Sequence, residues 1–334
     1  MRIALVSDAW LPQVNGVVRT LTTIAREVKA LGHELVTVSP DRFRTIPCPT
    51  YPEIRLALAP GRGVRRLLEE ARPDAIHIAT EGPLGMAARR YCLARGLPFT
   101  TAFHTRFPEY VSARFLLPVS LGYAWLRRFH RPSRGIMVAA PSIRRELERR
   151  GFSAIRPWSR GVDAELFAPE RREDFPGIAR PIFMAVGRVA VEKNLAAFLE
   201  LDLPGSKVVV GDGPQLAELK RRFPAAHFLG RHEGLSLARC YASADVLVFP
   251  SLTDTFGLVL LEALASGVPV AAFPVTGPVD VVGEAPVGRL DRDLRKAALA
   301  CLDIPRAACR DYALSFTWQA TARQFLENLA PIGA

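Results

Sequence analysis

Residues 248–270, VFPSLTDTFGLVLLEALASGVPV, predict the end of a buried strand, a polar turn, a helix and the start of a second strand. The strand ends at Pro250-Ser251, the turn carries Asp254, and the helix covers 257–265. Gly267 and Pro269 then separate the helix from the next apolar run. Two apolar strands joined through a helix indicate parallel pairing, so this segment predicts a doubly wound α/β sheet.

The same alternation extends through both halves of the chain. In the second half we expect strands over 182–186, 207–210, 227–229, 246–249 and 270–273, with helices over 194–199, 215–222, 235–242 and 257–265. In the first half we expect strands over 2–7, 34–39, 75–78, 98–102 and 136–140, with helices over 17–31, 64–71, 84–95 and 143–150. Residues 161–180, rich in Pro and Gly, interrupt the pattern as a linker, so the sequence predicts two parallel-sheet domains.

The net charge of +11 is concentrated in the first half. Residues 1–160 hold 26 Lys and Arg against 12 Asp and Glu, a net charge of +14, and residues 161–334 carry a net charge of −3. A one-sided field favours an anionic partner, namely a membrane surface, a nucleic acid or a phosphorylated substrate. The alternative is a solubility surface in an arginine-rich proteome, since Lys29 is the only lysine of that half.

Cysteine usage and hydropathy bear on the compartment. The five cysteines include no CxxC pair, which indicates thiols in a reducing compartment. Residues 2–7 are too short an apolar run for a secretory leader. The longest apolar stretch, 258–275, is interrupted by a Glu, a Gly and a Pro, so we expect no transmembrane helix and a cytoplasmic protein.

Two glycine-containing turns follow predicted strands of the second half. Gly187-Arg188 ends the strand over 182–186, and Lys193 opens the next helix, so two cations lie beside the positive end of a helix dipole and suit a diphosphate. Gly211-Asp-Gly213-Pro follows the strand over 207–210. Neither half contains GxGxxG or GxxxxGK[ST], which argues against a standard dinucleotide or P-loop site.

Asp254 and Glu262 are carboxylates eight positions apart at the mouth of one predicted helix. Because they only accept hydrogen bonds, they can hold hydroxyl groups of a sugar and a ribose. The backbone amides of 255–258 can meet an anion. The residues alone leave a helix-capping role open for Asp254 and a partly buried structural role open for Glu262.

A series of segments in order resembles the retaining glycosyltransferases of family 4, which have the GT-B fold. The segments are SDAWLPQVNGVVRTL (7–21), FHTRFPEY (103–110), RGVDAELFAP (160–169), GRVAVEKN (187–194), GDGP (211–214), PSLTDTFGLVLLEALASGVPV (250–270) and FTWQATARQFLENL (316–329). Asp254 and Glu262 match the paired acidic motif, with Asp where most of the family has Glu. The TDTFG form is similar to bacterial α-mannosyltransferases that use GDP-mannose and to glycosyltransferases that act on diacylglycerol-type lipids.

The resemblance implies two Rossmann-like domains facing a central cleft. The N-terminal acceptor-binding domain would cover 1–165, the nucleotide-sugar-binding domain 166–312, and a C-terminal helix within 313–334 would pack back on the first domain. It also implies transfer of a hexose from a nucleotide-diphosphate sugar, with GDP-mannose favoured and a UDP-hexose next. Neither a cofactor nor a metal is expected.

The resemblance also implies roles for individual residues. Arg188 and Lys193 would bind the donor diphosphate, Glu262 the ribose, Asp254 the transferred sugar and His104 the sugar from the N-terminal side. Asn15 and Arg106 are neighbouring candidates. The remaining donor-binding positions that we expect are Gly16, Gly187, Gly211, Gly213, Leu229, Thr255, Phe256, Gly257 and Leu258.

Residues 111–134 combine an aromatic and aliphatic body with arginines at its end, which is typical of a helix at a membrane interface. A buried packing segment with a basic end is the alternative. With the charge of the first half, the segment favours a peripheral enzyme on the inner face of the cell membrane and a lipid acceptor such as diacylglycerol or a glycolipid.

Other function classes remain open. A soluble sugar or polysaccharide acceptor would need no membrane, and a non-catalytic nucleotide-sugar-binding protein would bind a donor without turnover. Nucleic acid is not an expected partner, because the arginines are scattered without a binding motif. A sugar-nucleotide epimerase fits less well, since the matched motifs are those of transferases.

Overall fold

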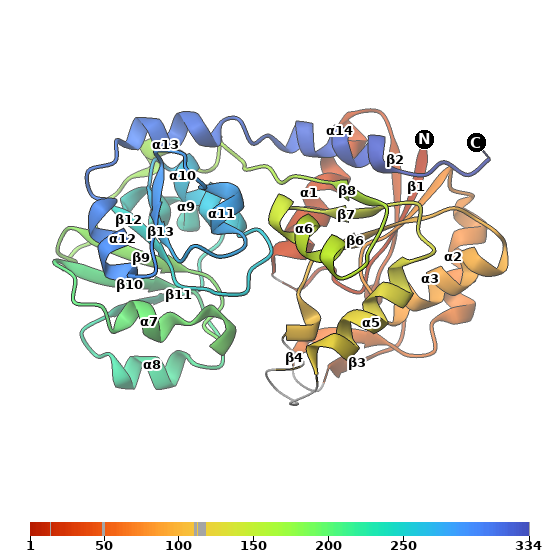
Figure 1. Cartoon of the computed structure of the whole chain (residues 1–334), viewed down its shortest axis with the longest axis horizontal. Helices are drawn as coiled ribbons and strands as arrows, with labels where there is room; N and C mark the ends of the chain where they lie inside the picture. Colours follow the sequence, from red (N-terminus) through yellow and green to blue (C-terminus); the bar gives the residue numbers. More distant parts are fainter. Residues whose placement is uncertain (14, 49–50, 110–111, 113–117, 334) are drawn as a thin grey trace. The chain divides into compact units, whose positions relative to one another are not determined.

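The computed structural model describes residues 1–13, 15–48, 51–109, 112 and 118–333 (Figure 1). The chain divides into two compact units. Unit 1 consists of Met1–Arg160 together with Trp318–Ala334, and unit 2 is Gly161–Thr317. The divisions therefore fall a few residues from the boundaries at 165 and 313 that the sequence suggested.

Unit 1 is built on a six-stranded parallel sheet in the order β2-β1-β5-β6-β7-β8. Its strands are β1 (Arg2–Val6), β2 (Glu34–Val38), β5 (Ala75–Ile78), β6 (Thr100–Phe103), β7 (Ile136–Val138) and β8 (Ile155–Pro157). Its helices are α1 (Gly16–Ala30), α2 (Gly61–Ala71), α3 (Pro83–Ala94), α5 (Val119–His130), α6 (Pro141–Arg149) and α14 (Trp318–Asn328), and η1 (Pro40–Arg42) is a 3-10 turn. An antiparallel pair, β3 (Thr45–Cys48) and β4 (Tyr51–Ala57), lies outside the sheet.

Unit 2 repeats the architecture with the order β11-β10-β9-β12-β13-β14. Its strands are β9 (Ile182–Val186), β10 (Ser206–Val210), β11 (His227–Gly230), β12 (Val246–Phe249), β13 (Val270–Ala272) and β14 (Gly288–Leu290). Its helices are α7 (Leu195–Leu199), α8 (Leu216–Arg222), α9 (Gly234–Ser243), α10 (Leu258–Ala265), α11 (Pro278–Val281), α12 (Leu294–Ala300) and α13 (Arg306–Ala313). Two 3-10 turns, η2 (Pro169–Arg171) and η3 (Val191–Lys193), complete it.

Burial explains why these segments form parallel sheets. All four residues of β5 and all four of β12 are buried, as expected for strands covered on both faces. Helix α1 buries Val18, Leu21, Ile24 and Val28, which recur every three or four residues on one face. Helices flank each sheet on both sides in Figure 1, and the prediction of two doubly wound α/β sheets is confirmed.

Each sheet reverses its strand order at one point. In unit 1 the reversal lies between β1 and β5, and in unit 2 it lies between β9 and β12. Because all the strands are parallel, the loops that follow them emerge at one edge of the sheet. Ligands of open α/β sheets bind outside the carboxyl ends of the strands at such a reversal. A ligand site of unit 2 is therefore expected at the loops after β9 and β12.

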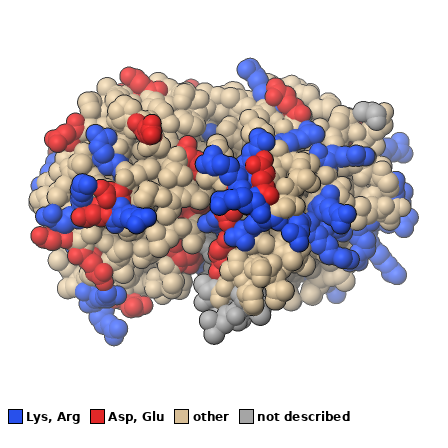
Figure 2. Space-filling model, viewed as in Figure 1, with Lys and Arg blue, Asp and Glu red and all other residues tan. Residues whose placement is uncertain are grey.

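The surface of unit 1 is basic, in agreement with the excess of arginine in the first half of the sequence. Figure 2 shows Lys and Arg side chains gathered over unit 1, whereas basic and acidic side chains are mixed on the visible face of unit 2. Among the described residues, none of the helices combines the length and the apolar content needed to cross a bilayer. Part of the predicted interface segment, residues 111 and 113–117, lies outside the described residues.

Candidate active site

The loops at the strand reversal of unit 2 carry four of the predicted residues. Gly187 and Arg188 follow β9, and Lys193 ends η3 in the same loop. Asp254 lies in the loop that follows β12. The two loops are bound together, since the Asn194 side chain donates to the carbonyl of Pro250 over 3.1 Å. The topology thus brings together residues that are far apart in the chain.

Gly211 and Gly213 allow the loop after β10 to lie directly against the loop after β9. A Cβ atom at Gly211 would lie 1.8 Å from the carbonyl oxygen of Gly187, and one at Gly213 would lie 2.4 Å from that of Val189. Both glycines also have positive φ, 150° and 157°. The amide of Val189 donates to the carbonyl of Asp212 over 2.9 Å, which fastens the loops together. These two glycines therefore shape the loop that carries Arg188.

Lys193 and Asp254 form an ion pair in unit 2. The Lys193 Nζ atom lies 2.7 and 2.8 Å from the two carboxylate oxygens of Asp254. The exposed fractions of the two side chains are 26% and 18%, so the pair lies partly within the surface. The ammonium that the sequence assigned to a diphosphate and the carboxylate that it assigned to a sugar thus meet each other in this structure.

Glu262 is held inside unit 2 by a tyrosine of α9. Glu262 is only 4% exposed, and the hydroxyl of Tyr241 donates a hydrogen bond to its Oε2 atom over 2.8 Å. Tyr241 itself is fully buried, and its ring packs edge-on against Phe167 at 5.6 Å between centroids. A buried carboxylate needs such a donor, because an isolated charge in an apolar interior is costly.

The start of α10 contains the remaining predicted positions of this region. Gly257 is the N-cap residue, and Leu258 is the first helical residue. Thr255 and Phe256 precede it, and Phe256 is buried. Amides at the start of a helix can bind an anion. Leu229 lies in β11, two strands from β9 on the side of β10.

In unit 1, the loop after β1 leads into α1 at Gly16. Gly16 is thus the first residue of this helix, one position before the start at residue 17 that the sequence predicted. The Asn15 side chain caps the helix by accepting hydrogen bonds of 3.0 Å from the amides of Val17 and Val18. The side-chain oxygen of Asn15 therefore has a structural role as the cap of α1.

His104 follows β6 and lies beside a buried arginine. The Arg160 Nη2 atom is 3.2 Å from the His104 Nδ1 atom, and the two rings of His104 and Trp158 are 5.6 Å apart in an edge-on arrangement. The pKa of His104 lies well below its ordinary value, because burial desolvates the ring and because the positive charge of Arg160 opposes its protonation. His104 is therefore neutral at physiological pH.

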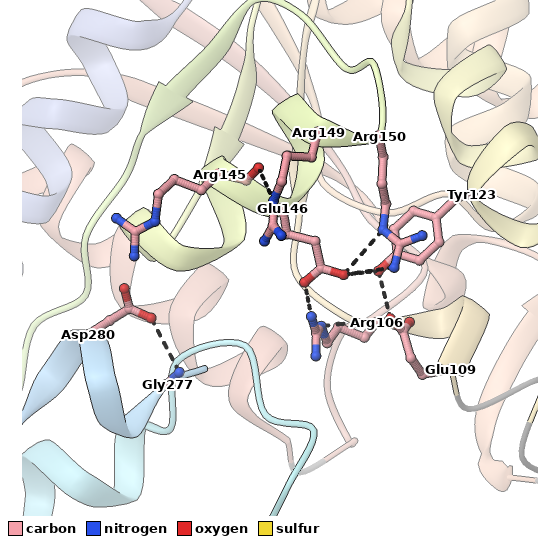
Figure 3. Close-up of polar contacts among 9 residues, drawn as sticks. All are labelled: Arg106, Glu109, Tyr123, Arg145, Glu146, Arg149, Arg150, Gly277 and Asp280. Atoms are coloured by element: carbon pink, nitrogen blue, oxygen red, sulfur yellow. Dashed lines mark hydrogen bonds and ion pairs between the residues drawn. The ribbon is translucent and has the colours of Figure 1, made fainter. Parts of the chain in front are cut away.

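Arg106 takes part in a network that ties the loop after β6 to two helices (Figure 3). Its guanidinium donates to Glu146 of α6, which also accepts a hydrogen bond of 3.0 Å from Arg150. Tyr123 of α5 donates to Glu109 over 2.8 Å, and the Arg150 guanidinium lies 3.8 Å from the Tyr123 ring centroid. Arg106 is thus engaged in holding this part of unit 1 together.

Asp291 and Asp293 each bind a neighbouring residue within unit 2. Asp293 caps α12 by accepting from the amide of Lys296, and Asp291 pairs with the Lys296 ammonium at 2.9 Å. Within the part of the chain that the structure describes, no group of three His, Cys, Asp or Glu side chains could hold a metal ion.

Comparison with known proteins decides the family. Residues 14–166 match Glycosyltransferase Family 4, and residues 180–303 match a family described as glycosyl transferases group 1. The chain is 31% identical, over 84% of its length and 81% of the relative's, to a GDP-mannose-dependent alpha-mannosyltransferase of Mycobacterium tuberculosis. The chain belongs to glycosyltransferase family 4. It is a hexosyltransferase, and the expected resemblance is confirmed.

Two further comparisons place this glycosyltransferase among its relatives. It is 26% identical, over 81% of its length and 79% of the relative's, to an alpha-monoglucosyldiacylglycerol synthase of Acholeplasma laidlawii. Its fold is similar to that of a sucrose-phosphate synthase from Thermosynechococcus elongatus, with a TM-score of 0.77, 19% identity and coverage of 98% of this chain and 97% of the other. The latter likeness supports the GT-B fold.

Two residues of the site were not found from the sequence. Tyr241 lies in a helical segment with no motif of its own, and it reaches Glu262 only because α9 and α10 pack together. Arg160 stands at the start of a family segment, yet nothing in that segment indicates that it meets His104, 56 positions away. Both are contacts of tertiary structure.

Proposed function

We propose that this glycosyltransferase moves a mannosyl residue from GDP-mannose to a membrane lipid, such as diacylglycerol or a glycolipid, with retention of configuration and without a metal. The observation that carries the donor is the 31% identity to a relative named for its dependence on GDP-mannose. A UDP-hexose is the second candidate donor. The lipid acceptor is supported by the similarity to a glucosyldiacylglycerol synthase.

The donor would be held mainly by unit 2. Arg188 and Lys193 would meet the diphosphate, and the amides at the start of α10 would add to the positive field. Glu262 would accept hydrogen bonds from the ribose, and Asp254 from the transferred sugar. For the diphosphate to reach Lys193, the ammonium would exchange part of its contact with Asp254 for phosphate oxygens.

The chemical step would rest on stabilisation of the leaving group. As the bond between the sugar and the diphosphate breaks, negative charge develops on the leaving phosphate oxygen, where Arg188 and Lys193 can stabilise it. That oxygen can take the proton of the acceptor hydroxyl, so no protein base is required. His104 would contact the transferred sugar.

The acceptor side is supported by α5. Leu121 and Trp125 are 62% and 48% exposed, and with Arg128 they lie at i, i+4 and i+7 on one helical face. The opposite positions Tyr123 and Leu126 are buried against unit 1. An exposed apolar pair beside arginines is typical of a helix at an anionic membrane interface. We propose that this face attaches the enzyme to the inner face of the cell membrane.

The donor is tested by turnover across a panel of GDP- and UDP-sugars, with and without diacylglycerol vesicles. We expect turnover of GDP-mannose that depends on the vesicles and is lost in Glu262→Ala. The matched variant Glu218→Ala changes an exposed carboxylate of α8 and should keep full activity. Turnover without any dependence on lipid would favour a soluble sugar or polysaccharide acceptor. Donor binding with no turnover would favour a non-catalytic nucleotide-sugar-binding protein.

The membrane face is tested by co-sedimentation with vesicles that contain anionic lipid. The double variant Leu121→Ser, Trp125→Ser should bind about thirtyfold more weakly, because each residue contributes roughly 1 kcal/mol of apolar transfer and the two together roughly 2 kcal/mol. Leu314→Ser removes a comparably exposed leucine, 46% exposed, from unit 2 and should bind like the unchanged protein. Equal binding of all three proteins would remove α5 from the proposal.

A further inference from the structure

Arg160 is a buried cation that makes hydrogen bonds to His104 and to two backbone carbonyls that precede it in the chain. The residue is 4% exposed. Its Nη1 atom donates to the carbonyls of Trp158 and Ser159 over 2.7 and 2.9 Å, and its Nη2 atom lies 3.2 Å from the His104 Nδ1 atom. Its guanidinium also lies 4.5 Å from the Trp158 ring centroid. These contacts fix the guanidinium from three sides.

The contact with His104 has only one chemically sensible direction. A guanidinium has five N–H donors and no acceptor, so the Nδ1 atom of His104 must accept. A neutral imidazole that accepts at Nδ1 carries its proton at Nε2. We propose that Arg160 is a positioning residue that holds His104 as the neutral imidazole with its proton on Nε2. The inference rests on the proposed function, in which His104 contacts the transferred sugar; the Nε2–H group would donate to a sugar oxygen.

The surrounding charges act in the same direction. Among the described residues, Arg160 and His77 are ionisable groups that act on the pKa of His104. Burial lowers the pKa of the Arg160 guanidinium to about 9, so it is still a cation at neutral pH. Burial, with Arg160 as the second cause, lowers the pKa of His77 to about 3, so His77 is neutral. A second proton on His104 is therefore opposed over the whole physiological range.

Helix α14 holds in place Trp158, the ring against which Arg160 packs. Trp158 is fully buried, its Nε1 atom donates to the carbonyl of Thr321 over 3.2 Å, and its ring centroid is 5.3 Å from that of Phe325. Without α14 the tryptophan would lose its hydrogen bond and its packing partner. Thus the C-terminal helix of unit 1 supports the arginine that in turn orients the histidine.

The unchanged protein provides the first test. Long-range ¹H–¹⁵N spectra of protein labelled in its histidines report the tautomer and protonation of each ring, and the signals of His104 are identified by their absence in His104→Gln. We expect the Nε2–H tautomer of His104 from pH 5 to pH 8. A proton on Nδ1, or an imidazolium at pH 6.5, would overturn the proposal without any variant of Arg160.

Variants then test whether the contact matters for the reaction. Arg160→Met keeps the length of the side chain but removes its charge and donors, so we expect kcat to fall at least tenfold. The acidic limb of the pH profile should move to higher pH but stay below the ordinary pKa of histidine, because burial still lowers the pKa of His104. Arg160→Lys keeps the cation and should restore most of kcat and the original pH profile. The matched control is Arg156→Met, because Arg156 is an arginine of the same segment that donates to the carbonyl of Asn328 in α14 over 3.0 Å and does not contact His104.

Each outcome bears on one claim. If folded Arg160→Met keeps the kcat and pH profile of the unchanged enzyme, or if Arg156→Met shows the same loss, Arg160 does not position His104. If Arg160→Met does not fold, Arg160→Lys decides the question. This variant should keep the Nε2–H tautomer of His104, and a folded Arg160→Lys that lacks this tautomer would overturn the inference. Absence of turnover in the unchanged enzyme counts against the proposed function, whereas the spectra still decide the state of His104.

Discussion

Replacing Tyr241 with phenylalanine removes one hydroxyl group from a fully buried ring and leaves its packing intact. That hydroxyl donates to Glu262 over 2.8 Å, and Glu262 is 4% exposed. Hydrogen bonds to charged groups stabilise proteins by about 1.5–3 kcal/mol. We therefore expect the free energy of unfolding of Tyr241→Phe to fall by about that amount.

The same change should affect donor binding more than the chemical step. In the proposed function, Glu262 holds the ribose, which is remote from the bond that breaks. If half of the lost energy is felt in the complex, about 0.75–1.5 kcal/mol, the KM for the donor rises by about four- to twelvefold. We expect kcat to stay within about twofold, because an interaction made equally before and during the reaction changes KM alone.

The assay is steady-state kinetics in the donor together with urea unfolding, and Tyr312→Phe is the matched control. The Tyr312 hydroxyl donates over 2.7 Å to the backbone carbonyl of Val281, a neutral acceptor in the same unit. Its loss should cost about 0.5–1.5 kcal/mol of stability and leave KM unchanged. An unchanged KM in Tyr241→Phe, or an equal rise in Tyr312→Phe, would refute the assigned connection between Tyr241, Glu262 and the donor.

Three further predictions concern the loops and the buried histidine. Gly211→Ala should destabilise unit 2 by more than 2 kcal/mol, since its Cβ would lie 1.8 Å from a backbone oxygen, while Gly230→Ala, with open space around it, should cost about 1 kcal/mol in thermal unfolding. His77 has a folded pKa of about 3 against 6.5 unfolded, so stability should fall with acid by about 1.4 kcal/mol per pH unit between those values, and urea titrations of His77→Gln should show a shallower fall. Asp254→Asn should bind GDP up to about fivefold more tightly by calorimetry, because it frees Lys193 from its ion pair, yet lose turnover; weaker GDP binding would contradict this.

The sequence predicted those features whose causes are local. Fully apolar strands such as β9 and β12, each followed by a glycine or proline turn and a helix, indicate a parallel sheet by themselves. The pair β3 and β4 was missed, because Thr45–Cys48 is short, contains a proline and lacks the alternation of a strand. Helices α11, α12 and α13 were also missed, because they have only 4, 7 and 8 residues, too few to show a clear helical pattern.

Motifs in the sequence pointed to the candidate residues, but the contacts between these residues could not be predicted from the sequence. Lys193 and Asp254 are 61 positions apart, and the sequence gives each a separate role without indicating that they pair. Similarly, Arg106 was a candidate on the strength of its neighbours, whereas in the structure it binds Glu146, 40 positions away. Side-chain contacts over such separations depend on strand order and helix packing, which a linear pattern does not specify.

The placement of α14 in unit 1 has a consequence for the order in which the protein is completed on the ribosome. Unit 2 is one continuous stretch, Gly161–Thr317, and all of it emerges before Trp318. Domains generally fold as units during synthesis. Unit 1, although its first 160 residues are made earliest, must wait for α14 before Trp158 gains its partners Thr321 and Phe325. The half of the enzyme that is synthesised first is therefore the half that is finished last.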